Sequence, residues 1–229
     1  MKVVHSLCFS ILILNGCSQL DRPDHTATAS SNDINITEQR PIDASDYASH
    51  LIYPRETEYF VAVDDLVIYE DPFYGAAVSY VDKRDYPDII TVFIYPIPAT
   101  SWRNEALILN SELDAFITEL DNTVKIGAYQ SRGPEQRSSY TVTKNGQTFT
   151  GMKVHFQFTN KFGTEYNADA YIFIQKDKFI KIRTSSPKEF TPEWNGDLIA
   201  NELLPEFIVP DESDYMRNLR DEQRRQPKI

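Results

Sequence analysis

Two runs of alternating polar and apolar residues on either side of Asn145-Gly146 constrain the fold of this chain more than any other feature. Asn-Gly is the dipeptide most typical of a two-residue hairpin loop, because both turn positions need a positive φ. A loop of this length pairs Val142 with Phe149 and Thr141 with Thr150. The segment therefore predicts antiparallel pairing between strands that are neighbours in the sequence.

The second strand of this hairpin has a change of parity. Phe149 is odd-numbered, whereas the next apolar residues are even-numbered: Met152, Val154, Phe156 and Phe158. Residue parity decides which face of a sheet a side chain occupies. The strand therefore either buries both of its faces or contains a bulge, for which Gly151 is the expected place.

A further hairpin is expected after this strand. Residues 166–175 and 179–184 are both rich in apolar and aromatic residues, and we place the turn between them at Asp177-Lys178. In that register four apolar side chains share one face of the sheet: Tyr171, Phe173, Ile180 and Ile182.

The remaining elements complete an α+β pattern. Further strands are expected in residues 59–69, 76–81 and 89–97. Residues 101–120 are expected to form a helix, because their apolar residues recur at three- and four-residue spacing. A second helix is expected in residues 192–207, which begin with a proline at the favoured first position. Strands, one helix, more strands and a final helix predict a largely antiparallel sheet of about six to eight strands with two main helices packed on it. This order resembles the α/β/α sandwich of the photosystem II extrinsic P-subunit superfamily, and that resemblance implies no activity.

The N-terminus has the layout of a secretory signal. Lys2 precedes a short apolar stretch, Val3–Leu14, which is far below the roughly 20 residues that span a bilayer. The stretch ends in Leu14-Asn15-Gly16-Cys17, which resembles the lipobox of bacterial lipoproteins. Asn15 departs mildly from the family pattern, where Ala or Ser is more usual. The alternative is an ordinary signal peptide followed by a cysteine of no special role.

The lipobox resemblance implies cleavage before Cys17, lipid attachment to its thiol and a location in the cell envelope. In this family an Asp directly after the cysteine favours the inner membrane, and here the residue is Ser18. For a Gram-negative host, the resemblance therefore implies the outer membrane, facing the periplasm. Cys8 leaves with the leader, so the mature chain would contain no disulfide and no thiol for metal binding or catalysis.

The composition divides the chain into four parts. We expect a signal peptide at residues 1–16, the lipidated cysteine and a flexible linker at 17–50, one α+β domain at 51–209, and a polar tail at 210–229. Met216 and Leu219, three residues apart, allow a short surface helix in that tail. A coil the length of this linker has an end-to-end distance of roughly 30 Å, which would keep the domain close to the membrane. The net charge of −11 argues against nucleic-acid binding and against membrane attachment through a basic surface as a whole.

The sequence contains none of the common catalytic motifs for hydrolases, metalloproteases or nucleotide-binding enzymes. His155 is the one histidine inside the expected domain. It could act as the base of a Ser-His-Asp triad, with Asp169 or Glu165 on the next strand to orient it. The alternative, which we favour, is a half-buried or surface histidine of a strand.

Carboxylates are plentiful in the first half of the domain: Asp64, Asp65, Glu70, Asp71, Asp82, Asp85 and Asp88. A pair of them could act as in a glycosidase, and Asp64-Asp65 with Glu70-Asp71 could bind calcium. Most of these residues fall at expected turns, where aspartate supports the backbone, so we favour solvated turns. No cofactor and no metal site is predicted.

Tyrosines also gather in the first half of the chain: Tyr53, Tyr59, Tyr69, Tyr74, Tyr80, Tyr86 and Tyr95. They could line a groove for a sugar or peptide, but we favour strand propensity and core packing as their explanation. Together these features predict a membrane-anchored envelope lipoprotein whose non-catalytic domain binds a protein, peptide or glycan or supports an assembly. The alternative is an envelope hydrolase that uses a carboxylate pair or His155.

Overall fold

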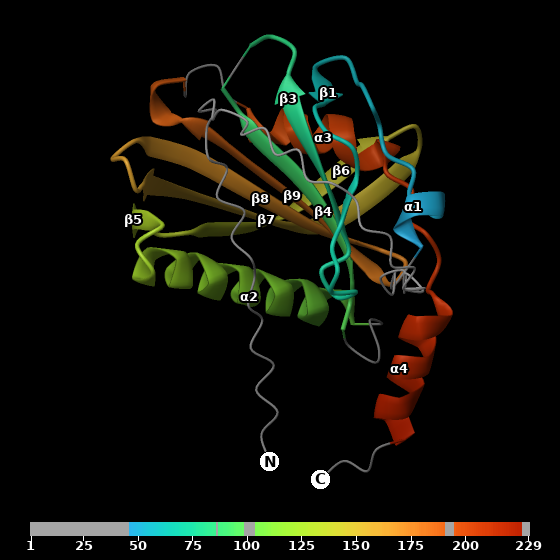
Figure 1. The fold of residues 1–229 in the computed structure, drawn as a ribbon. Coiled ribbons are helices and arrows are strands. Elements are labelled where there is room, and N and C mark those ends of the chain that lie inside the picture. Colours follow the sequence, from blue (N-terminus) through green and yellow to red (C-terminus); the bar gives the residue numbers. More distant parts are fainter. Residues whose placement is uncertain (1–45, 86, 99–103, 191–194, 226–229) are drawn as a thin grey trace, which may run out of the picture. The chain divides into compact units, whose positions relative to one another are not determined.

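The computed structural model describes residues 46–85, 87–98, 104–190 and 195–225, which form a nine-stranded sheet with helices on both of its faces (Figure 1). The strands are β1 (Phe60–Ala62), β2 (Val67–Ile68), β3 (Ala76–Asp82), β4 (Ile89–Pro96), β5 (Tyr129–Arg132), β6 (Gln136–Lys144), β7 (Gln147–Asn160), β8 (Glu165–Gln175) and β9 (Lys178–Pro187). The α-helices are α1 (Tyr47–His50), α2 (Glu105–Lys125), α3 (Gly196–Leu203) and α4 (Asp214–Arg225). Two 3-10 turns, Lys188–Phe190 and Leu204–Glu206, follow β9 and α3.

The sheet has the order β1-β3-β4-β9-β8-β7-β5, with β2 beside β3 and β6 beside β7. Each pairing between neighbouring strands is antiparallel. The predicted α+β class with a largely antiparallel sheet is thus confirmed. The number of strands exceeds the expected six to eight, because β5 was not expected: its four residues are mostly polar and show no alternating apolar pattern. The helices α1 and α4 add to the two that were expected.

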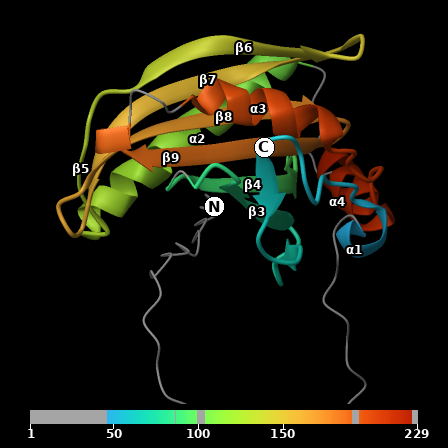
Figure 2. The ribbon, with the colours of Figure 1, turned by 90° about the horizontal axis from the view of Figure 1, so that it is seen from above.

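The two faces of the sheet are covered by different helices, α2 on one face and α3 on the other (Figure 2). The core under α2 contains Leu113 and Phe116 of the helix together with Val154, Phe156 and Ile172 of the sheet. The core on the α3 face contains residues from the first helix, the sheet and the segment around α3: Tyr47, Val78, Tyr171, Phe173, Ile199, Leu203 and Phe207. Strands β8 and β9 contribute side chains to both cores.

The first predicted hairpin is confirmed in its register. Val142 pairs with Phe149 and Thr141 with Thr150. Asn145 and Gly146 have φ values of 55° and 78°, the positive angles that the two-residue loop requires. Local turn chemistry therefore fixes this pair of strands.

Of the two alternatives for this strand, a bulge at Gly151 is absent, because β6 and β7 keep one register along their whole length. The strand instead buries both faces: Phe149 packs against the α3 core, and Val154 belongs to the α2 core. Glycine is needed at position 151 for a different reason. A Cβ atom there would lie 2.2 Å from the carbonyl oxygen of Ile172, so the neighbouring strand comes too close for any side chain.

The second hairpin turns one residue earlier than expected. Gln175 pairs with Lys178, so the loop consists of Lys176 and Asp177, and Lys176 has a positive φ of 56°. The expected shared face is nevertheless correct, since Tyr171 pairs with Ile182. Lys178 is the first residue of β9 rather than part of the turn.

The two main helices differ from their expected bounds. Asn104 caps α2, with its side chain accepting a hydrogen bond from the Leu107 amide at 3.2 Å. The helix continues past Leu120 to Lys125, and Gly127, with a φ of 76°, follows its end. The predicted apolar stripe is buried as expected: Leu109, Leu113, Phe116, Ile117 and Leu120. The second helix begins at Gly196, capped by Asn195, and its expected start at residues 192–194 lies outside the described residues.

Packed residues extend beyond the expected 51–209 domain at both ends. Tyr47 is fully buried before it, and Met216 and Arg220 of α4 are buried after it. Residues 210–225 are thus not simply a polar tail, because one side of α4 lies against the domain. Within the described ranges, no helix is both long enough and apolar enough to cross a membrane.

Candidate functional site

His155 and Asp169, which the sequence singled out, meet on the α3 face of the sheet. They are directly opposite each other in the pairing of β7 with β8. The His155 Nδ1 atom lies 2.9 Å from Asp169 Oδ1. The Asp169 side chain is 3% exposed, whereas that of His155 is 32% exposed. Glu165, the other candidate partner, instead forms an ion pair with Lys188 at 3.0 Å.

Asp169 is the centre of a larger polar cluster. Its Oδ2 atom lies 3.3 Å from the Tyr171 hydroxyl and 3.6 Å from Lys153 Nζ. Burial raises the pKa of the Asp169 carboxyl, and the positive charge of Lys153 and the hydrogen bond with His155 partly offset that rise. The buried carboxylate thus has a partner for each of its oxygens.

The N-terminus of α3 closes the cluster. Asp197, in the first turn, accepts hydrogen bonds from Tyr171 at 2.6 Å and from Lys153 at 2.7 Å. An acidic residue is favourable there because the helix dipole is positive at this end. Gly196 comes so close that a Cβ atom would lie 2.4 Å from Asp169 Oδ2. The first residue of the helix therefore packs against the buried carboxylate, with no space for a side chain between them.

The order of residues across the sheet matters for catalysis. Along one row His155 has Gln136 of β6 on one side and Asp169 of β8 on the other, and Asp169 is followed by Thr184 of β9. A nucleophile–histidine–acid relay needs the hydroxyl on the side of the histidine away from the acid. That side holds an amide, Gln136, while the hydroxyl of Thr184 lies beyond the acid. Burial and the neighbouring carboxylates of Asp169 and Asp197 raise the pKa of the Tyr171 phenol, so Tyr171 stays protonated and donates its proton to Asp197.

The predicted carboxylates lie on several loops, and Asp82 and Asp88 are close enough for the charge of Asp82 to raise the pKa of Asp88. Asp64, Asp65, Glu70, Asp71 and Asp85 are exposed. Asp71 accepts a hydrogen bond from the Phe73 amide at 2.8 Å, and Asp82 is bonded to Arg84 at 2.9 Å. Asp88 is half-buried before β4. Among the described residues, no group of three or more His, Cys, Asp or Glu side chains has an arrangement that could hold a metal ion.

The tyrosines of the first half do not line one groove. Tyr80 belongs to the core on the α3 face, whereas Tyr95 belongs to the core under α2. Tyr69 and Tyr74 form a local edge-to-face pair with ring centres 6.3 Å apart. Tyr86 and the lipid-attachment candidate Cys17 lie outside the described residues.

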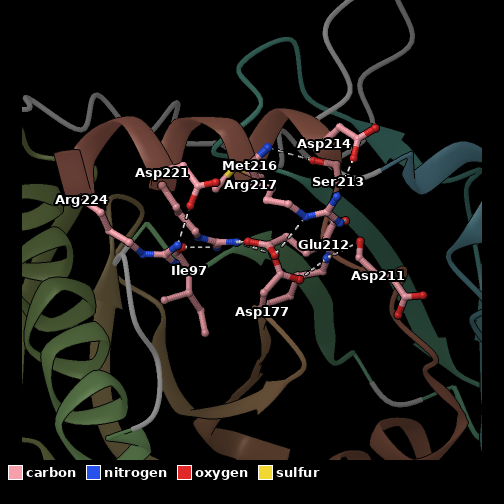
Figure 3. Close-up of polar contacts among 12 residues, drawn as sticks. Ile97, Asp177, Asp211, Glu212, Ser213, Asp214, Met216, Arg217, Asp221 and Arg224 are labelled. Carbon is pink, nitrogen blue, oxygen red and sulfur yellow. Dashed lines mark hydrogen bonds and ion pairs between the residues drawn. The ribbon is translucent and has the colours of Figure 1, made fainter.

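A second polar cluster, which sequence reasoning missed, joins α4 to the sheet. Arg220 is 1% exposed and contacts Asp177 at 2.9 Å, the carboxylate of Glu212, and the carbonyl oxygen of Ile97 at 2.5 Å. Figure 3 shows Asp177 and Ile97 facing the helix that carries Met216. Lys178, also buried, has its pKa lowered by burial. These charges neutralise one another inside the fold, which is the arrangement of a structural clamp.

Comparisons with known proteins find only distant similarity. No family model matches the chain, and no curated protein matches it. Among solved structures, cyanobacterial PsbP (CyanoP) from Synechocystis sp. PCC 6803 has a TM-score of 0.42 and 14% identity, covering 79% of this chain and 98% of that one. The Ran-binding protein Mog1p of Saccharomyces cerevisiae has a TM-score of 0.39 and 14% identity, covering 73% and 94%. Neither likeness carries information about the activity or partner of this chain.

Proposed function

We propose that this chain is a lipid-anchored protein of the cell envelope whose α+β domain binds a partner without catalysing a reaction. The observation that carries the proposal is the lipobox-like Leu14-Asn15-Gly16-Cys17 directly after a short apolar leader. Cys17 is the only cysteine after that leader, so its thiol has no disulfide partner in the mature chain. A lipoprotein carries two or three acyl chains, which hold a protein firmly where a single chain would not.

The polar cluster around Asp169 supports a non-catalytic domain. Lys153, His155 and Tyr171 surround the carboxylate, and the row of side chains places Gln136, not a nucleophile, beside the histidine. A protein, peptide or glycan of the envelope is the class of partner that we propose for the domain. For a Gram-negative host, Ser18 after the cysteine favours the outer membrane, facing the periplasm.

Metabolic labelling with a fatty-acid analogue tests the anchor. We expect the wild-type protein to be labelled and recovered with membranes, and the Cys17→Ser variant to be unlabelled and released to the soluble fraction. Cys8→Ser is the matched control, since that cysteine would leave with the leader and its replacement should change neither result. A labelled, membrane-bound Cys17→Ser protein would show that the proposed anchor is wrong.

A hydrolase is the second candidate, and the contact between His155 and Asp169 at 2.9 Å is the observation that favours it. In that case His155→Ala and Asp169→Asn should each abolish a cellular phenotype that depends on the protein, while leaving the protein folded and in place. Gln157→Ala, next on the same face, serves as the control. A phenotype that survives both replacements would leave the binding function as the better explanation.

A further inference from the structure

Two apolar side chains are the most exposed of the large hydrophobic residues in the described part of the chain. Phe162 is 79% exposed, and Ile126 is 66% exposed. Phe162 lies in the turn between β7 and β8, and Ile126 is the residue that caps the C-terminus of α2. Neither belongs to a core of the fold, so contact with a partner could still remove their apolar surface from water.

These two residues lie at the same end of the domain. Tyr129, three residues after Ile126, pairs with Asn160, two residues before Phe162. The Gln130 side chain also donates a hydrogen bond to the carbonyl oxygen of Lys161 at 3.2 Å. Both ribbon views show the end of α2, β5 and the β7–β8 turn together at one extremity of the sheet (Figures 1 and 2).

The same end carries two exposed lysines, Lys125 and Lys161, each adjacent in sequence to one of the apolar residues. Lys161 Nζ lies 5.0 Å from the centre of the Phe162 ring, and Lys125 Nζ donates to the amide oxygen of Asn122 at 3.3 Å. Every other lysine of the described ranges forms an ion pair with a carboxylate: Lys83, Lys144, Lys153, Lys176, Lys178, Lys181 and Lys188.

The acids close to this end are already engaged. Asp121 contacts Arg132 at 2.6 Å, and Glu165 contacts Lys188 at 3.0 Å. Glu135, which lines one hollow with Lys125, shares Arg132 with Asp121 and also contacts Arg137. Among the described residues, no carboxylate lies within ion-pair distance of Lys125 or Lys161, although the whole chain has a net charge of −11. We call the set Lys125, Ile126, Lys161 and Phe162 the basic tip.

We propose that the basic tip contacts the anionic headgroup layer of a lipid membrane, with Phe162 and Ile126 inserted among the headgroups. Lysines attract anionic lipids, and apolar side chains beside them gain free energy by leaving water. The proposal rests on the proposed lipid anchor for its setting. A contact this small binds weakly alone, but a tether keeps it at high local concentration. The tip would then set which side of the domain faces the membrane.

Vesicle binding by the unlipidated chain tests the proposal. Residues 18–229 keep every described residue, including both cores, so this chain should fold; its thermal unfolding checks that it does. We expect it to co-sediment with vesicles of phosphatidylglycerol mixed with phosphatidylcholine more than with phosphatidylcholine alone. Added salt should weaken the binding, because the attraction is electrostatic.

Substitutions locate the contact. The Ile126→Ala/Phe162→Ala double variant should lower the vesicle partition coefficient about tenfold, because most of the inserted apolar surface is lost. Lys125→Gln/Lys161→Gln should remove the preference for phosphatidylglycerol. Leu107→Ala is the matched control: it is 63% exposed on the same helix, roughly 28 Å away, and should change binding less than about twofold.

Two results would overturn the proposal: no binding of the parent chain to phosphatidylglycerol vesicles at low salt, or equal binding by the parent and the Ile126→Ala/Phe162→Ala variant. This chain lacks Cys17, so the outcome is independent of lipidation. A failed labelling experiment at Cys17 would therefore remove the anchor and leave the vesicle result standing, and the reverse also holds.

Discussion

Asp169 and Asp88 are two partly or fully buried carboxyls with different surroundings. Burial raises the pKa of both. Lys153 and His155 contact Asp169 and partly offset the effect, so its charge has partners inside the fold. For Asp88 burial raises the pKa to about 6 and the nearby negative charge of Asp82 adds to the rise, while Ser186 and the charge of Arg84 partly offset it. Ionisation of Asp88 therefore costs stability at neutral pH.

We expect Asp88→Asn to stabilise the protein at pH 7 by about 1–2 kcal/mol, a value reduced from the full pKa shift because the side chain is half-buried. The folded-state pKa lies above the unfolded value, so the stabilising contribution of the protonated carboxyl is complete below pH 4 and is lost as pH rises through 6. The difference between variant and wild type should shrink as pH falls from 7 to 4. Urea unfolding at several pH values measures it.

Asp85→Asn is the control for this prediction, because Asp85 is exposed and belongs to the same loop. Its stability should stay within about 0.5 kcal/mol of the wild type. A pH-independent gain for Asp88→Asn would contradict the assignment of the shifted pKa to this carboxyl.

Sequence reasoning predicted part of the site at this scale. It named His155 and offered Asp169 as its partner, since alternation along adjacent strands indicates which side chains share a face. Lys153 and Asp197 were missed, because their meeting depends on where α3 crosses the sheet. The need for glycine at position 196 could not be predicted either, because the sequence around it does not show that Asp169, far away in the chain, packs against it.

The elements show the same division between local and distant causes. Asn145-Gly146 predicted its hairpin to the residue, because two positive φ angles and a short loop leave one register. The helix α4 was expected to be part of a polar tail, because Arg220 looks like any solvated arginine in the sequence. Its burial depends on Asp177 and Ile97, which come from a hairpin turn and from the residue after β4.

Arg220→Ala should destabilise the protein by about 3–5 kcal/mol, because it leaves the buried carboxylate of Asp177 without this cation. Arg217→Ala is the matched control on the same helix, since Arg217 is exposed and pairs with Asp214, and should cost no more than about 0.5 kcal/mol. Thermal unfolding of both variants gives the comparison. Similar losses for the two arginines would contradict a buried clamp.

At the scale of the whole molecule, the two cores are not independent, because β8 and β9 supply side chains to both. Tyr171 faces the α3 core, and its neighbour Ile172 faces the α2 core. If β8 or β9 unfolds, its side chains leave both cores at once. The domain should therefore unfold as one cooperative unit.

Leu113→Ala, a fully buried change in the α2 core, tests this cooperativity. We expect a loss of about 2–5 kcal/mol and a single transition, with far-ultraviolet and near-ultraviolet circular dichroism changing at the same urea concentration. Val78→Ala in the α3 core should behave in the same way with a smaller loss. Separate transitions for the two signals would show that the two halves are uncoupled.

The clamp at α4 also bears on how the chain is made. Arg220 donates to the carbonyl oxygen of Ile97, a partner 123 positions earlier in the sequence, and both Asp177 and Lys178 are buried close to it. Because synthesis proceeds from the N-terminus, these two charges exist for some time before the arginine that completes their surroundings. A chain released before residue 220 would expose an unfinished interior to proteases. A chain that stops before α4 should therefore be degraded faster than one that contains this helix.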